Sequence, residues 1–374
     1  MNQSRVNPIL WVHPFLCRGV ISFLMCQLKA NLRSVSLLFF FLAFAPVVAE
    51  SQTTATFHPL HLSGFHIRDP WILAYAPTHT YYLYASNFDR ITGVHRAGVM
   101  VYKSRDLKNW DGPSVVFTVP NGTWADAQQS AWAPEVHAWK GRFYLFVTLH
   151  NPAKVIAQPP AAWQTTFARG TTIAVSDSPD GPFKFVKTDG PIPPPDFMTI
   201  DGTFYIDPQG NPWMVYAHEW TQKIDGTIEA LPLKPDLSAA AGAPVFLFKG
   251  SDAPWLDSTM RPDTRPNTYV TDGPELYRSK DGHLLMLWSS FEPRGYVETV
   301  ARSKSGEIQG PWEQLPPLFE HDGGHGMLFR AFDGQLMLVL HSTNRNPYAR
   351  LFGVDDKGDH LELARECTDL DAAK

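Results

Sequence analysis

The chain is poor in cysteine, in basic charge and in phosphate-binding motifs, and each shortage excludes a class of protein. It has 3 Cys among 374 residues, and only Cys367 lies beyond residue 49, so we expect no internal disulfide in the processed chain. The formal net charge is -5, which gives no basic footprint for binding nucleic acid. No Gly-rich phosphate loop is present, which argues against a nucleotide or phosphoryl-transfer enzyme.

Long apolar runs are scarce as well, and the most apolar one lies near the N-terminus. Arg33 precedes the run 35–45, and small residues follow at Val47 and Ala49. The run is short for a membrane span. Together these features predict a signal peptide over residues 1–49, cleaved after Ala49, with Met25 as an alternative start that would make residues 1–24 an extension. We therefore expect a secreted or periplasmic protein with no membrane association once the signal is removed.

The composition of the remaining chain favours β-structure. Hydrophobic residues make up 44% and aromatic residues 13% of the sequence, with 12 Trp and plentiful Pro and Gly. Many short strands separated by turns fit this composition better than long helices do. Trp and Tyr can fill a β core, and they can also stack on the apolar faces of sugar rings.

A repeat of five units organises the chain. Each unit has a polar residue beside a Gly or Pro turn, followed 8 to 12 residues later by the start of an unbroken apolar run. The runs begin 62, 70, 71 and 51 residues apart and end in small or polar residues. The five marker residues are Asp69, Glu135, Asp201, Glu275 and His325, and the runs are 81–86, 143–148, 213–218, 284–290 and 335–341.

Such a repeat predicts an all-β, five-bladed β-propeller over residues 50–374. After each run come further strand-like segments and a turn, as in 98–104 and in Asp180-Gly-Pro-Phe183. Units of three to four strands at this period bury their faces by stacking in a closed ring. We take the apolar run as the innermost strand of each blade. The marker ahead of each run then points into one central cavity.

Several carboxylates converging on one cavity repel one another, which is costly unless the site uses them. Hydrolysis of a glycosidic bond needs one carboxylic acid that protonates the leaving group and one carboxylate that acts as base or nucleophile. A third carboxylate near the acid raises its pKa by like-charge repulsion. The markers supply this set.

The sequence resembles glycoside hydrolase family 43 in five motifs, which occur in order and at blade spacing. They are Arg68-Asp-Pro-Trp-Ile72, Trp132-Ala-Pro-Glu135, Ile200-Asp-Gly-Thr-Phe204, Asp272-Gly-Pro-Glu-Leu276 and Gly323-Gly-His-Gly-Met327. The resemblance implies a five-bladed propeller that hydrolyses arabinose- or xylose-containing polysaccharides with inversion. It assigns Asp69 as the general base, Asp201 as the residue that orients the acid and tunes its pKa, and Glu275 as the general acid.

The resemblance leaves other roles open. Glu135 either hydrogen-bonds to the substrate or makes a structural contact. His325 either faces an axial cation, such as a structural calcium in the central channel, or is a hydrogen-bonded core histidine. The chemistry itself requires no cofactor. Asp272 and Asp207 are predicted to be turn residues.

Aromatic and basic residues near the markers are further candidates for sugar binding. Trp71, Trp132 and Phe204 form either the floor of a sugar site or part of the core. Arg294 and Arg330 either reach substrate hydroxyls or lie on the surface.

Two alternatives compete with an exported inverting glycosidase. A sucrose- or fructan-cleaving propeller also carries Arg-Asp-Pro but usually has Glu-Cys at the acid, whereas Leu276 follows Glu275 here. A non-catalytic carbohydrate-binding propeller would be expected to lack one of the three carboxylates, and all three are present.

We expect a monomer whose partner is its carbohydrate substrate. Two segments are predicted to wall the pocket: the insertion 151–170, and the loop 249–270 with Trp255 and Arg261. Such walls favour exo action on a terminal arabinofuranosyl or xylosyl unit.

Overall fold

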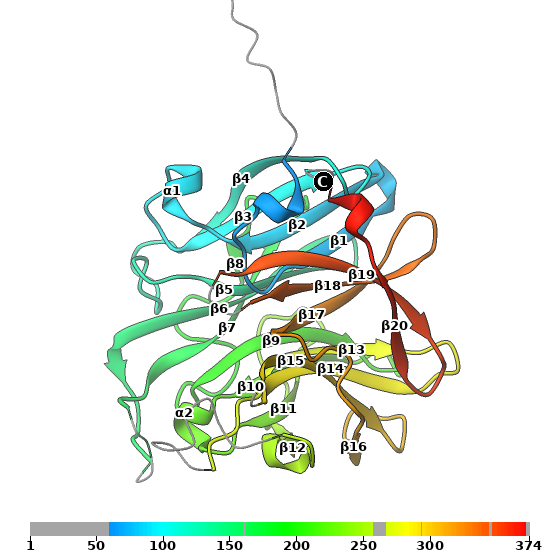
Figure 1. The fold of residues 1–374 in the computed structure, drawn as a ribbon. Helices are drawn as coiled ribbons and strands as arrows, with labels where there is room; N and C mark the ends of the chain where they lie inside the picture. The colour runs from blue at the N-terminus through cyan, green and yellow to red at the C-terminus, as the bar shows by residue number, and fades with distance from the viewer. Residues whose placement is uncertain are drawn as a thin grey trace, which may run out of the picture. The chain divides into compact units, whose positions relative to one another are not determined.

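In the part of the chain that the structure describes, twenty strands form five antiparallel sheets of four strands each (Figure 1). The computed structural model describes residues 60–159, 162, 164–256, 267–292, 294–343 and 346–371. Each sheet, or blade, is made of four strands that follow one another in the chain. The predicted all-β, five-bladed propeller is confirmed.

The blades are numbered in chain order. Blade 1 contains β1 (Trp71–Tyr75), β2 (Thr80–Ser86), β3 (Gly98–Ser104) and β4 (Trp110–Thr118). Blade 2 contains β5 (Trp132–Trp139), β6 (Arg142–Val155), β7 (Phe167–Ser176) and β8 (Lys184–Phe185). Blade 3 contains β9 (Thr199–Ile206), β10 (Pro212–His218), β11 (Thr227–Pro232) and β12 (Val245–Lys249). Blade 4 contains β13 (Asp272–Arg278), β14 (Leu284–Glu292), β15 (Gly295–Ser303) and β16 (Trp312–Gln314). Blade 5 contains β17 (Gly323–Arg330), β18 (Leu336–Ser342), β19 (Tyr348–Asp356) and β20 (Leu361–Glu366). The helical segments are α1 (Asp89–Thr92), α2 (Trp220–Lys223), η1 (Leu62–Gly64), η2 (Ala76–Thr78), η3 (Gly250–Asp252) and η4 (Thr368–Leu370).

The first strands of the five blades form a closed ring around the axis. Each of β1, β5, β9, β13 and β17 contacts the first strands of the two neighbouring blades. This arrangement corrects the sequence-based interpretation, because the five apolar runs are the second strands and not the innermost ones. A second strand is covered on both faces by neighbouring blades, so it is mostly apolar, as in β10 and β18, which are buried throughout and carry His or Ser only at their C-terminal ends. The first strand carries the Gly, Pro and polar residues instead.

A left-handed residue at or just before the start of each first strand sets the direction of the markers. The residues at this position all have a positive φ: Asp69 (50°), Ala133 (42°), Asp201 (55°), Gly273 (47°) and His325 (50°). In blades 2 to 5 the pairing of first and second strands shifts register at this point. Bulges re-aim side chains next to active sites, and Gly, Asp and His tolerate the left-handed conformation better than most residues.

The five markers therefore occupy two kinds of position in the first strands. Asp69, Asp201 and His325 occupy the left-handed position itself, whereas Glu135 and Glu275 come two residues after it. Residues two positions after the bulge pair with equivalent positions of the second strands, as Glu135 does with Phe146 and Glu275 with Leu287. The sequence pattern merged these two classes because both follow the same kind of turn.

Side chains packed between neighbouring blades form the core. Met214 and Tyr216 of blade 3, for example, share a buried cluster with Tyr144 and Phe146 of blade 2. Among the described residues no strand is exchanged between blades 5 and 1, which are joined by contacts such as the Ile72 N–H, 3.4 Å from Met327 Sδ.

The predicted wall segments differ in how much of them is described. The insertion 151–170 continues β6 and β7, which pair as far as Val155 and Phe167. Arg261 lies outside the described residues, as does the predicted signal peptide 1–49. In the described part of the chain no helix is long and apolar enough to cross a membrane. Cys367 is buried with a free thiol.

Candidate active site

Four of the five markers line one small cavity at the axis. Asp69, Glu135, Glu275 and His325 share this cavity. Its enclosed space is about 10 Å³, close to the room that one water molecule needs. The remaining lining residues are Pro70, Trp71, Ala133, Gly273, Gly326 and Met327. The prediction that residues far apart in sequence meet at one place is confirmed for these four markers.

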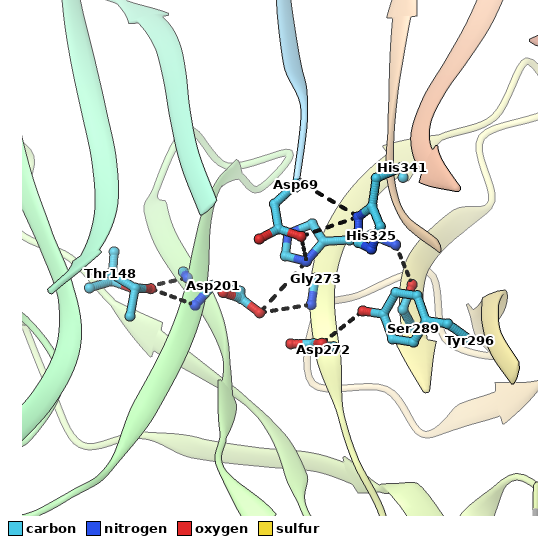
Figure 2. Close-up of polar contacts among 12 residues, drawn as sticks. Asp69, Thr148, Asp201, Asp272, Gly273, Ser289, Tyr296, His325 and His341 are labelled. Atoms are coloured by element: carbon cyan, nitrogen blue, oxygen red, sulfur yellow. Dashed lines mark hydrogen bonds and ion pairs between the residues drawn. The ribbon is translucent and has the colours of Figure 1, made fainter. Parts of the chain in front are cut away.

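Asp69 is held by two histidines of blade 5 (Figure 2). Its Oδ1 lies 3.3 Å from His325 Nδ1 and 3.3 Å from His341 Nδ1. Burial raises the pKa of Asp69, but the charge of His325 and the hydrogen bond with His341 outweigh it, so the net pKa is well below the usual value. Burial lowers the pKa of His341, which therefore contributes as a neutral ring. Asp69 is thus an ionised carboxylate throughout the neutral pH range.

Asp201 lies outside the cavity lining and fixes the chain that leads to Glu275. Its Oδ2 accepts a hydrogen bond from the Gly273 N–H at 3.2 Å, and its own N–H donates to Thr148 Oγ1 at 2.8 Å (Figure 2). Gly273 is two residues ahead of Glu275, so this contact anchors the strand that carries the acid. Burial, and then the charge and hydrogen bond of Asp272, raise the pKa of Asp201 well above its usual value.

Glu275 is set up as a protonated carboxyl. It is 9% exposed, and its Oε2 accepts a hydrogen bond from the Leu328 N–H at 2.7 Å. Burial raises its pKa well above the usual value, and the charges of Glu135 and Glu298 add to the effect. Asp201 was expected to tune this acid, but the charges found to raise the pKa of Glu275 belong to other residues. The contact of Asp201 with Gly273 fits its other expected role, that of orienting the acid.

Glu135 makes a structural contact and also lines the cavity. Its Oε2 lies 2.9 Å from His137 Nε2. The His137 ring packs against Trp71, with ring centroids 4.5 Å apart, and the Trp71 Nε1–H donates to the Val136 carbonyl at 3.0 Å. Trp71 is buried in the core and also lines the cavity, so both of its predicted roles stay open.

A group of three residues beside the cavity could hold a cation. Asp201, Asp272 and His325 offer ligand atoms that all lie within 4.8 Å of one another. The two carboxyls face each other at the axis, and such a pair needs either a shared proton or a cation between them. Two carboxylates suit calcium, whereas the imidazole is an unusual ligand for it, so water would have to supply further oxygens.

Trp132 is an exposed ring on a rigid support. It is 37% exposed, and the Arg169 guanidinium lies 4.9 Å from its centroid. Arg169 is buried, donates to both carboxylate oxygens of Glu219 at 2.7 and 2.5 Å, and donates to His150 Nδ1 at 2.9 Å. The support comes from blades 2 and 3, so the ring keeps one orientation, which suits stacking on a sugar.

Other predicted substrate residues lie elsewhere. Phe204 packs between Phe146 and Trp139 at the junction of blades 2 and 3, which matches core packing. Arg294 is exposed and pairs with Glu292 and Glu320, at 3.4 and 3.3 Å. These places fit the core alternative for Phe204 and the surface alternative for Arg294.

Three more predictions concern residues outside the cavity lining. Arg330 is exposed and donates to the Tyr277 hydroxyl at 3.1 Å. Trp255, a predicted wall residue, donates to the Leu315 carbonyl at 3.1 Å and packs near Trp288. Asp207 is a turn residue, as predicted, and accepts the N–H groups of Gln209 and Asn211.

Sequence reasoning missed three polar residues of the site: Asp272, His341 and Glu298. Asp272 was expected to serve a turn, but its Oδ2 accepts a hydrogen bond from the Tyr296 hydroxyl at 2.7 Å, and it faces Asp201. His341 ends an apolar run, where it was counted as part of the run. Glu298 is a charged residue inside the strand-like segment 296–302, and an acid in a buried strand was the signal to follow.

The chain is similar in sequence to several known proteins. A sequence profile described as Glycosyl hydrolases family 43 matches residues 62–365. The extracellular endo-α-(1→5)-L-arabinanase 1 of Bacillus subtilis is 24% identical over 171 residues, which cover 41% of this chain and 49% of that protein. The extracellular exo-α-(1→5)-L-arabinofuranosidase of Cellvibrio japonicus is 25% identical over 274 residues, 66% of this chain and 73% of that protein. The match thus spans about half the length of the first relative.

The chain is also similar to a solved structure, and this match covers nearly the whole length of the solved chain. The crystal structure of an endo-arabinase from Bacteroides thetaiotaomicron is 38% identical and superimposes with a TM-score of 0.70. The match covers 81% of this chain and 99% of that one.

Proposed function

The chain belongs to glycosyl hydrolases family 43 and is a glycosidase, and on this basis we propose that it hydrolyses arabinan-type polysaccharides or oligosaccharides with inversion. The observation that carries the proposal is the cavity in which Asp69, Glu135, Glu275 and His325 meet. The arabinan substrate is supported by the names of the similar enzymes, which act on α-1,5-linked arabinose or on arabinan.

We assign the proton transfers to Asp69 and Glu275. An inverting enzyme needs a carboxylate that takes a proton from water while a carboxylic acid protonates the departing oxygen. Asp69 is kept ionised, and both histidines contact its Oδ1, so Oδ2 is the oxygen assigned to the water. Glu275 is kept protonated, and the Leu328 N–H engages Oε2, so Oε1 is assigned to carry the proton. The sugar carbon lies between them, and its configuration inverts.

Neighbouring residues keep these two groups in place. Asp201 orients the acid by holding Gly273. Glu135, fixed by His137, lines the cavity as a second acceptor and is assigned to a substrate hydroxyl. Trp71 and Trp132 are assigned to contacts with sugar rings.

A panel of substrates tests the proposal. The purified protein is incubated with linear arabinan, xylan, sucrose and nitrophenyl glycosides of arabinofuranose and xylose. We expect release of arabinose or arabino-oligosaccharides from arabinan. Release of sugar from sucrose alone would favour the fructan-type alternative, and binding of arabinan without cleavage would establish a carbohydrate-binding protein.

The mode of cleavage is read from the same digests. Exo action stays a prediction, since the similar enzymes include endo- and exo-acting ones. An exo enzyme yields a single short product from the first minutes and lowers viscosity slowly. Early appearance of a ladder of oligosaccharides would refute exo action.

We further propose that Asp201, Asp272 and His325 hold a structural cation, with calcium as the first choice. A ligand present at 100 times its Kd stabilises the folded state by about 2.7 kcal/mol, which for a chain of this size raises Tm by about 5 °C. We expect this rise when calcium is added to protein stripped with EDTA. Asp272→Asn should abolish the rise. Equal Tm values with EDTA and with calcium, in the unsubstituted protein, would contradict a calcium site.

The localisation is also a proposal. The two curated relatives above are described as extracellular, and the predicted signal peptide fits export to the periplasm or the medium. N-terminal sequencing of the mature protein should begin at Glu50. A mature chain that retains the run 35–45 would refute cleavage after Ala49.

A further inference from the structure

Glu298 is a buried carboxyl that the reaction described above does not use. It lies in β15, the third strand of blade 4, and is 0% exposed. Burying a carboxylate costs several kcal/mol unless hydrogen bonds compensate. Its Oε2 is well satisfied, whereas its Oε1 is buried and has no partner among the described residues.

The side-chain hydrogen bonds of Glu298 connect it to the bulge of blade 5, directly or through Ser289. Its Oε2 accepts the Gly326 N–H at 2.6 Å and the Ser289 hydroxyl at 2.9 Å. The Ser289 oxygen in turn accepts the His325 N–H at 2.7 Å (Figure 2). A Cβ at Gly326 would lie 2.9 Å from Glu298 Oε2, so this close approach requires glycine. Glu298 and Ser289 together fix two consecutive N–H groups at the site.

At the junction between blades 2 and 3, the two equivalent N–H groups are held without a charged side chain. There the Asp201 N–H donates to Thr148 Oγ1 and the Gly202 N–H donates to Thr171 Oγ1, both at 2.8 Å. Thr171 pairs with Thr148 in the sheet as Glu298 pairs with Ser289, so the two positions are equivalent. A hydroxyl is therefore enough to hold a bulge. Holding the bulge therefore does not explain why residue 298 is a glutamate.

A contact two residues further along β17 suggests a second role for Glu298. Glu298 holds the Gly326 N–H, and Glu275 holds the Leu328 N–H at 2.7 Å, so two carboxyls of blade 4 bind alternate N–H groups of one strand. We propose that Glu298 is a positioning residue for Glu275: by fixing Gly326 it places the Leu328 N–H, which engages Oε2 of the acid and leaves Oε1 for the departing oxygen. The inference rests on the proposed function, because it assumes that Glu275 is the proton donor.

Electrostatics gives Glu298 a second effect on the same acid. Burial raises the pKa of Glu275 most, and the charges of Glu135 and Glu298 raise it further. Asp69 and His325 face Glu275 across the cavity, and the charge of Asp272 acts on Glu298. Burial raises the pKa of Glu298 well above its usual value, although the hydrogen bonds from Gly326 and Ser289 oppose this shift in part. A neutral residue at 298 should therefore let Glu275 lose its proton at lower pH.

Two substitutions test the inference. Glu298→Thr rebuilds the arrangement seen at Thr171, and Glu298→Gln keeps an acceptor of the same length. Each is compared with the unsubstituted protein on two arabinofuranosides, one with a poor leaving group and one with a dinitrophenolate leaving group. Glu313→Gln in β16, a partly exposed glutamate that pairs with Arg302 at 2.9 Å, serves as a charge control.

We expect the variants to fold, with circular dichroism spectra like that of the unsubstituted protein. On the poor leaving group the alkaline limb of kcat/KM should move to lower pH, and activity on that limb should fall about tenfold, a part of the 10²–10⁴-fold worth of acid catalysis. On the dinitrophenyl substrate the limb should stay in place. The control should match the unsubstituted protein on both.

Several results would overturn the inference. An equal loss on both substrates at every pH would make Glu298 merely structural, as would failure of both variants to fold. Unchanged pH profiles of kcat/KM in both variants would show that Glu298 does not position Glu275. If the unsubstituted protein cleaves neither arabinofuranoside nor arabinan, the proposed function itself falls and takes this inference with it.

Discussion

Replacing Glu275 by Gln is expected to lower kcat on arabinan by about 10²–10⁴-fold, the range that general acid catalysis supplies. The amide keeps the shape of the side chain and can still accept the Leu328 N–H, so the strand that carries it should stay in place. It cannot protonate the departing oxygen. A dinitrophenyl arabinofuranoside leaves without protonation, so its kcat should fall far less.

Steady-state kinetics on the two substrates measures the difference. Binding of arabino-oligosaccharides should survive, because the cavity still offers hydrogen-bonding groups. Equal slowing of both substrates would show that another group is the proton donor. Glu135, which shares the cavity, would then be tested next.

The fold could be predicted from the sequence because each repeat contains two local signals, an apolar run and a polar residue beside a turn. An apolar run covered on both faces leaves an unbroken hydrophobic pattern, and a bulge leaves Gly, Pro, Asp or His. The layer assigned to the run was wrong because burial on two faces does not say which neighbour lies on the axis. In β14 the run reads the same whether blade 4 starts with it or, as in the structure, with β13.

Site residues that stand in a sequence motif were predicted. Site residues whose role depends on contacts between blades were missed. Asp69, Glu275 and His325 stand in motifs beside turns, so their meeting at the axis followed from the repeat. His341 and Glu298 act through contacts with the next blade, and those contacts depend on how two blades pack.

Trp132 and Phe204 make the same point for aromatic residues. Each lies three residues from a marker, and the same two alternatives were predicted for both. Only the packing of Arg169 behind Trp132, and of Phe146 against Phe204, separates the exposed ring from the buried one.

Asp69→Asn is expected to slow arabinan and the dinitrophenyl arabinofuranoside alike, by about 10²–10⁴-fold, because water loses its base whichever group departs. This equal loss is the opposite of the pattern expected for Glu275→Gln, so the two variants control for each other. The asparagine can still accept a hydrogen bond from one histidine through its side-chain oxygen, so the fold should be retained.

Azide provides the sharper half of this experiment. It is a nucleophile that carries no proton to remove, so it needs no base, and it is small enough to take the place of the water. With the dinitrophenyl substrate, azide should restore turnover of Asp69→Asn and yield an arabinosyl azide whose anomeric configuration, read by NMR, is opposite to that of the substrate. The unsubstituted protein should gain little from azide, because its water is already activated.

The stereochemistry of the unsubstituted reaction then fixes what kind of pair Asp69 and Glu275 form. An inverting pair leaves room for water, and we predict a separation of about 6.5–9.5 Å between the two carboxyl groups in a substrate complex. The first product seen by NMR should have inverted configuration. A product of retained configuration, together with a separation of about 5 Å, would make Asp69 a nucleophile that forms a covalent intermediate. In that case azide would take the place of the missing carboxylate in the asparagine variant and would also give an inverted azide by a single displacement, so the azide product confirms that residue 69 acts on this face of the sugar but does not separate base from nucleophile. The two roles of Asp69 are therefore distinguished by the configuration of the first sugar that the unsubstituted protein releases: inverted for a base, retained for a nucleophile.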